Sequence, residues 1–191
     1  MEKNTDGMVE FPANGLLFGR YGTIDAGGVS GAEIVGQGDR YLRPIAAAAL
    51  FGIANSLTNR GFMIDFGDMS SSNGSDPWQP GGNHHAGHGH MGKRSGLDVD
   101  FRYVDADGLS FQSSNAFENE RYDSGTNQIV YDTAKRFGFT KNFQGLSGNL
   151  DGPTKIPAHN DHGHLGLQFK DLNWKYVKSA PTNGLLFNFN Y

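Results

Sequence analysis

The chain has 191 residues, no cysteine and a formal net charge of −4, with 37% hydrophobic residues and 28 glycines. This length suits one domain with a sizeable core, and the absence of cysteine excludes disulfides, thiolate zinc sites and cysteine nucleophiles. The mild negative charge argues against a nucleic-acid groove. The longest apolar run, 45–54, is about half of the ~20 residues that a membrane span needs, so no membrane span is expected.

The first 40 residues are rich in glycine and predict loops with two short strands. They begin with a polar stretch that is not followed by the apolar segment of a signal peptide, so no signal peptide is expected. From Leu42 to Leu57 apolar residues recur at helical spacing, with Pro44 tolerable in the first turn, which predicts a buried helix. The apolar run 62–66 predicts a short strand.

A long Gly/Ser/Pro-rich segment, 67–82, leads into a histidine-rich window. All seven histidines of the chain fall in two windows, 84–90 and 159–164. Scattered surface histidines would not gather in this way, and neutral imidazole is the commonest protein ligand of zinc. The two windows therefore predict a metal site, and the long loop before the first is expected to be functional.

The segment Gly96–Tyr103 alternates apolar and polar residues and predicts a core strand. One face is apolar, whereas Asp98, Asp100 and Arg102 share the other. Two carboxylates on one strand face are suited to hold a cation. Arg102 is expected to pair with one of them, and the Lys93-Arg94 pair is expected to form a solvated turn.

The second half predicts a polar loop over 105–125, a helix over Thr126–Phe137 with Gly138 beyond its end, and a strand over 139–143. Leu165, Leu167 and Phe169 alternate in a further core strand that His164 would open. The tail, 185–191, predicts an edge strand.

Together these elements predict a single α+β domain over residues 1–191, with a central antiparallel sheet, two flanking helices and a zinc site on the sheet. A catalytic zinc site needs three protein ligands and an open position for water. The candidates are a histidine of the first window, Asp100 or Asp98, and His164, holding one Zn²⁺. No His-Glu-x-x-His segment is present, which excludes the zinc peptidases that bind the metal with one helix.

Gly96-Leu97-Asp98-Val99-Asp100 and His159-Asn160-Asp161-His162-Gly163-His164 resemble the paired motifs of the lysostaphin/D-Ala-D-Ala-peptidase type of zinc peptidases, most closely the penicillin-insensitive murein endopeptidases. The resemblance covers about 20 residues. It implies that Asp100 and His164 bind zinc and that Asp161 activates the attacking water. It also implies that His162 polarises or protonates near the scissile amide and that His159 orients the site.

The first motif departs from the pattern of that family. Six residues normally separate the ligand histidine from the aspartate, which would place Lys93 at the ligand position. Nine residues separate His90 from Asp100, and eleven separate His88 from Asp100. Either the chain carries a small insertion or the site is altered, and His90 is the preferred third ligand, with His88 as the alternate.

The resemblance implies a zinc-dependent hydrolase of amide bonds in peptidoglycan stem peptides, either a cross-link endopeptidase or a D-amino-acid carboxypeptidase. Such an enzyme acts in the periplasm or outside the cell, and without a signal peptide another system would deliver it, as for an exported antibacterial effector or a phage lytic enzyme. An immunity or inhibitor protein is then a candidate partner. The alternatives are a zinc-binding wall-recognition module without turnover and a metal-dependent nuclease.

Overall fold

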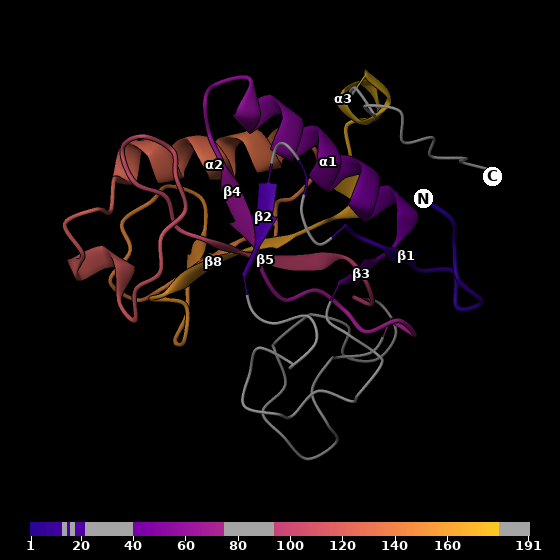
Figure 1. Ribbon diagram of the computed structural model, residues 1–191, viewed down its shortest axis with the longest axis horizontal. Helices are drawn as coiled ribbons and strands as arrows, with labels where there is room; N and C mark the ends of the chain where they lie inside the picture. The colour runs from indigo at the N-terminus through magenta and orange to yellow at the C-terminus, as the bar shows by residue number, and fades with distance from the viewer. Residues whose placement is uncertain (13–14, 16–17, 22–39, 75–93, 180–191) are drawn as a thin grey trace, which may run out of the picture.

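The computed structural model describes residues 1–12, 15, 18–21, 40–74 and 94–179. Within them, a mixed six-stranded sheet carries two helices on one face (Figure 1). The strand order is β2-β4-β5-β8-β6-β7, and β1 pairs with β3 in a separate two-stranded sheet. The predicted α+β class is therefore correct.

The strands are short except for the two at the centre of the main sheet. They are β1 (Val9–Glu10), β2 (Phe18–Arg20), β3 (Tyr41–Leu42), β4 (Ile64–Phe66), β5 (Asp98–Arg102), β6 (Phe143–Gln144), β7 (Thr154–Lys155) and β8 (His162–Gly166). The helices are α1 (Pro44–Thr58), α2 (Ser124–Arg136) and α3 (Trp174–Ser179), with 3₁₀ turns η1 (Ala116–Glu118) and η2 (Phe169–Asp171).

The sequence predicted an antiparallel sheet, and this is correct only for the central strands. β4, β5, β8 and β6 are mutually antiparallel neighbours, but β2 is parallel to β4 and β7 is parallel to β6. A parallel pair requires a crossover connection, and the crossover from β2 to β4 contains α1. Local alternation of polar and apolar residues carries no information on strand direction, so the sequence could not reveal these edges.

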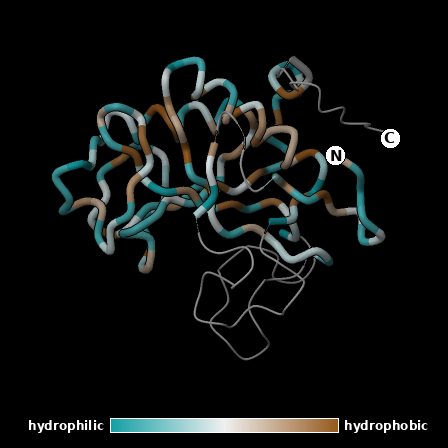
Figure 2. Tube along the Cα trace, in the orientation of Figure 1, coloured by the Kyte–Doolittle hydropathy of each residue, from teal (hydrophilic) through white to brown (hydrophobic). Residues whose placement is uncertain are grey.

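The α1 helix is buried along most of its length. Residues 46–54 and Leu57 are all buried, because the helix packs on the sheet and contacts both α2 and α3. Pro44 occupies the first turn, where the missing backbone N–H is not needed. Figure 2 shows hydrophobic segments concentrated where this helix and the strands meet, with hydrophilic segments in the outer loops.

Two polar contacts of α2 hold it in place. Asp123 caps its first turn by accepting the backbone N–H of Thr126 at 2.6 Å. The buried side chain of Asn127 binds both the N–H and the C=O of Val104, at 3.0 and 2.7 Å. Since Val104 lies just beyond β5, this amide fastens the helix to the end of the central strand.

The predicted strand that follows His164 is shorter than expected, and Phe169 does not belong to it. Leu165 and Leu167 are fully buried as expected, but Phe169 lies in η2 with 52% of its surface exposed. The strand ends at Gly166, and the 3₁₀ turn that follows breaks the two-residue period. The predicted strand over 139–143 is reduced to Phe143 and Gln144, while the tail, 185–191, lies outside the described residues.

Candidate metal centre

The polar face of the two central strands forms the centre of the candidate site. β5 and β8 pair with Asp100 opposite His164 and Arg102 opposite His162. Residues directly opposite in an antiparallel pair project from the same face, so these four side chains share one side of the sheet. The other side carries Phe101 and Gly163 against α2.

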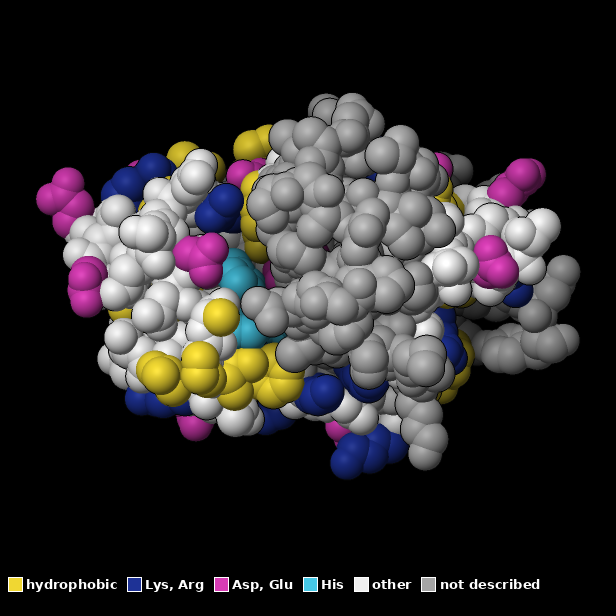
Figure 3. Space-filling view, turned by 90° about the horizontal axis from the view of Figure 1, so that it is seen from below, with side chains coloured by type: hydrophobic (Ala, Val, Ile, Leu, Met, Phe, Trp, Pro, Cys, Tyr) yellow, Lys and Arg dark blue, Asp and Glu magenta, His cyan; other side chains and the backbone are white. Residues whose placement is uncertain are grey.

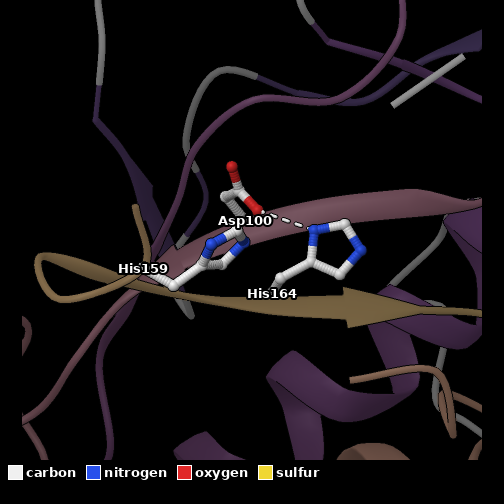
Figure 4. Close-up of side chains that lie close together, drawn as sticks. All are labelled: Asp100, His159 and His164. Atoms are coloured by element: carbon white, nitrogen blue, oxygen red, sulfur yellow. Dashed lines mark hydrogen bonds and ion pairs between the residues drawn. The ribbon is translucent and has the colours of Figure 1, made fainter. Parts of the chain in front are cut away.

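Asp100, His159 and His164 form a group whose ligand atoms all lie within 4.8 Å of one another. Figure 4 shows Asp100 on β5, His164 on β8 and His159 on the segment just before β8, with their side chains converging. Asp100 and His164 are buried and His159 is partly buried. Two imidazoles and a carboxylate are a donor set typical of zinc, and this group could hold one metal ion.

His159 is held in a form suited to binding a metal. Its Nδ1 lies 3.0 Å from the carbonyl oxygen of Pro157, which can only accept, so Nδ1 carries the proton and Nε2 keeps a lone pair. Burial lowers the pKa of His159 to about 4, which leaves the ring neutral at pH 7.

The backbone around His159 is fixed by two features. Ala158 has a φ of 62°, a left-handed conformation that non-glycine residues rarely adopt, and this turn sends the chain back toward the sheet. The hydroxyl of Tyr103 donates to the carbonyl oxygen of His159 at 3.0 Å. Tyr103 lies one residue beyond β5, so the central strand itself tethers the turn that carries His159.

His164 lies between two carboxylates. Its Nδ1 is 3.0 Å from Asp100 Oδ1, the contact dashed in Figure 4, and its Nε2 is 3.1 Å from Asp98 Oδ1. The ring of Phe143 on β6 packs over the imidazole, with centroids 4.8 Å apart. In this orientation of His164, Nδ1 faces Asp100 and Nε2 faces Asp98.

Asp161 and His162 form a hydrogen-bonded pair beside that group, with Asp161 Oδ1 2.8 Å from His162 Nδ1. Burial disfavours the charged imidazole, but the negative charge of Asp100, then the hydrogen bond and charge of Asp161, outweigh it and raise the pKa of His162. Burial would raise the pKa of Asp161, but its hydrogen bond to His162 and the charge of that ring lower it. The pair therefore favours an anionic carboxylate next to a protonated ring.

Arg102, which lies opposite His162 in the sheet, packs against Tyr21 beside the site. The Arg102 guanidinium lies 4.2 Å from the centre of the Tyr21 ring. Arg102 makes no ion pair with any residue in the part of the chain that the structure describes, so the expected pairing with Asp98 or Asp100 is wrong. Figure 3 shows histidine side chains at the surface of this sheet face, with an acidic and a basic side chain beside them.

Asp98 pairs instead with Arg94, which the sequence had assigned to a solvated turn. The Arg94 side chain is only 19% exposed, and its Nε donates to Asp98 Oδ2 at 3.0 Å while Nη2 donates to Oδ1. Asp98, the alternate ligand, is completely buried and stands outside the group of three. The signal for this pair was the four-residue spacing across the glycine turn at Gly96, whose φ is 65°.

The first histidine window lies outside the described residues, so the structure does not place His88 or His90. Of the residues predicted for the site, it brings together Asp100, His159 and His164, with Asp161 and His162 next to them. The difference from the sequence-based prediction is that His159, expected to orient the site, joins the candidate ligands.

No protein-family model matches this chain, and none of the curated proteins matches it either. No helix in the described part of the chain is long and apolar enough to cross a membrane.

Proposed function

We propose that this protein is a zinc-dependent hydrolase that cleaves an amide bond in peptidoglycan peptides. The observation that supports it most is the convergence of Asp100, His159 and His164 beside the Asp161–His162 pair. A metal-binding group alone would suit storage or structure. A carboxylate and an imidazole whose pKa is raised lie next to it, and they would supply the proton acceptor and the proton donor that amide hydrolysis requires.

Asp100 and His164 would hold the zinc ion together with a second histidine as the third ligand. His159 is the candidate within the described residues, and His90, with His88 as the alternate, is the candidate from the motif resemblance. When bound, zinc lowers the pKa of a water ligand and polarises a carbonyl group. The absence of thiolates leaves a nitrogen and oxygen donor set, which suits a catalytic site with an open position.

Asp161 and His162 would divide the proton transfers between them. The Asp161 side chain is 44% exposed and therefore open to solvent. It would accept a proton from the attacking water as the water oxygen bonds to the carbonyl carbon. His162, whose raised pKa favours the protonated ring, would give its proton to the leaving nitrogen as the C–N bond breaks. Its Nε2 lies 3.5 Å from Asp100 Oδ2, on the side of the metal-binding group.

The substrate class comes from the motif resemblance. Peptidoglycan stem peptides carry free carboxylates, and Arg102 places a positive charge at the same face of the sheet. Action in the periplasm or outside the cell, delivery by a separate export system and an immunity or inhibitor partner belong to this proposal.

The deciding experiment is digestion of purified peptidoglycan with the metal-free and the zinc-loaded protein, with the products identified by mass spectrometry. We expect loss of cross-linked or full-length stem peptides only with zinc, and chelation should stop it. Asp161→Asn is the matched variant, because it should keep zinc and lose turnover. Intact muropeptides in the presence of stoichiometric zinc would contradict the hydrolase and favour a wall-recognition module, and zinc- or magnesium-dependent cleavage of DNA would favour a nuclease.

A further inference from the structure

The Arg94–Asp98 pair lies directly behind His164 and contacts it. Asp98 Oδ1 is 3.1 Å from His164 Nε2, and both Asp98 oxygens also accept hydrogen bonds from the Arg94 guanidinium. Arg94 Nη1 donates to the carbonyl oxygen of Leu167 at 2.7 Å, which anchors the guanidinium to the end of β8. Guanidinium, carboxylate and imidazole thus form one continuous hydrogen-bonded chain.

Gly166 leaves the space that this chain occupies. It pairs opposite Asp98 in the sheet, and a Cβ atom there would lie 2.7 Å from both Arg94 Nη2 and Asp98 Oδ1. The same Cβ would lie 2.6 Å from the backbone oxygen of Lys141, so a side chain at this position would crowd the ion pair on a side where the backbone leaves no room. The glycine therefore belongs to the same arrangement as the ion pair, although it bears no functional group.

We propose that Arg94 and Asp98 are positioning residues that hold His164 with Nδ1 toward Asp100 and so preset the metal centre. The inference rests on the metal centre of the proposed function, but not on the identity of the substrate. An imidazole that gives its Nδ1 lone pair to a metal carries its proton on Nε2, and that proton needs an acceptor. Asp98 Oδ1 is the acceptor at that nitrogen.

Arg94 also explains why Asp98 does not join the ligands. A free carboxylate two residues before Asp100, on the same strand face, would compete for the metal. The planar guanidinium binds both Asp98 oxygens in a fork, which holds the carboxylate plane and balances its charge in a fully buried position. A lysine could balance the charge but could not bind both oxygens in this geometry.

The test measures zinc affinity by competition with a chelator in the wild type, four variants and a control variant. We expect Arg94→Gln and Asp98→Asn each to weaken zinc binding by about 10- to 100-fold, the usual effect of losing such a partner. If Arg94 acts through Asp98, adding Arg94→Gln to Asp98→Asn should cost little more. Arg94→Lys should fall between Arg94→Gln and the wild type. Arg121→Gln, which removes the surface ion pair with Asp105, should bind zinc normally.

A second measurement needs no variant that might fold poorly. Long-range ¹H–¹⁵N NMR of the zinc-loaded wild-type protein reports which ring nitrogen of His164 carries the proton. We expect the proton on Nε2 and the metal on Nδ1. The opposite assignment, or zinc affinities unchanged in Arg94→Gln and Asp98→Asn, would overturn the proposal.

The outcomes separate this inference from the proposed function. Tight zinc binding with the expected variant effects but no cleavage of peptidoglycan would remove the hydrolase and leave the positioning role intact. Cleavage of peptidoglycan by the wild type, with zinc affinities unchanged in Arg94→Gln and Asp98→Asn, would support the hydrolase and remove the positioning role. A wild-type protein that binds no zinc would overturn both.

Discussion

His159 and His162 lie three residues apart, yet the structure gives them different surroundings. Their rings pack against each other, with centroids 4.6 Å apart. His159 is neutral because burial lowers its pKa to about 4, whereas the neighbouring carboxylates raise the pKa of His162. One ring is therefore suited to give a lone pair to a metal and the other to give a proton to a substrate.

This difference predicts separate effects of two matched substitutions. His159→Gln should weaken zinc binding by about 100-fold or more, because it removes one of three ligands, whereas His162→Gln should change zinc affinity by less than about 10-fold and reduce kcat strongly. Calorimetric titration with zinc checks both. Normal zinc binding by His159→Gln would assign the third ligand to the first histidine window.

At the scale of elements, β5 and β8 carry the site on one face and the core on the other. Gly163 on β8 faces the core, where it is covered by the ring of Phe101 and the hydroxyl group of Tyr131. The hydroxyl of Tyr131 donates to the carbonyl oxygen of Phe143 at 2.7 Å, which links α2 to β6. The close contact at Gly163 lets α2 pack tightly against the strand that carries His162 and His164.

We expect Gly163→Ala to destabilise the protein by about 1–3 kcal/mol, because its Cβ would collide with the Phe101 ring and the Tyr131 hydroxyl group. Denaturant unfolding measures the change. Gly125→Ala is the control, since a Cβ in this first turn of α2 meets only Asp123 Oδ1, at 3.4 Å. Equal stabilities of the two variants would show that β8 and α2 have room to separate.

The cap of α2 supports a pH prediction. Hydrogen bonds from the side chain and then the backbone N–H of Thr126 lower the pKa of Asp123. A pKa lowered on folding means that the stabilisation is present above the unfolded value of ~3.9 and is lost as pH falls through the folded value. Asp123→Ala should therefore cost about 1 kcal/mol at pH 7 and much less near pH 2. A cost in thermal unfolding that stayed constant with pH would contradict this role.

At the scale of the whole molecule, the candidate metal centre joins distant parts of the chain. Asp100 lies near the middle of the chain, and His159 and His164 follow about 60 residues later, after α2 and the loops around β6 and β7. A ligand that binds only the folded state stabilises it by mass action. Zinc would therefore cross-link the centre of the sheet to the turn that precedes β8.

Zinc should accordingly raise the melting temperature, with a stabilisation of about 2.7 kcal/mol at a free concentration 100 times Kd. Differential scanning calorimetry of metal-free and zinc-titrated protein checks this. Asp100→Asn should remove the rise, whereas Asp105→Asn, a change of the same kind at the surface pair with Arg121, should retain it. A rise that survives in Asp100→Asn would place the metal elsewhere.

The sequence by itself determined the helices at the centre of the fold, the two central strands and which side chains share a face. Alternation put Asp98 and Asp100 together and set His164 opposite the apolar face of its strand, because a strand turns successive residues to opposite sides. That strand begins two residues earlier than predicted, at His162. Helical spacing likewise located α1 and α2 to within a few residues. These features depend on neighbours in the chain, so periodicity reveals them.

Only the tertiary structure decided the pairings across the chain. The register that sets Asp100 opposite His164 follows from core packing of β5 against β8, and the arrival of His159 depends on the turn at Ala158 and the tether from Tyr103. The partners of Asp98 likewise come from a glycine turn and from the gap at Gly166. Such contacts join residues that are far apart in the chain or whose partners depend on backbone geometry, and local periodicity carries no information about either.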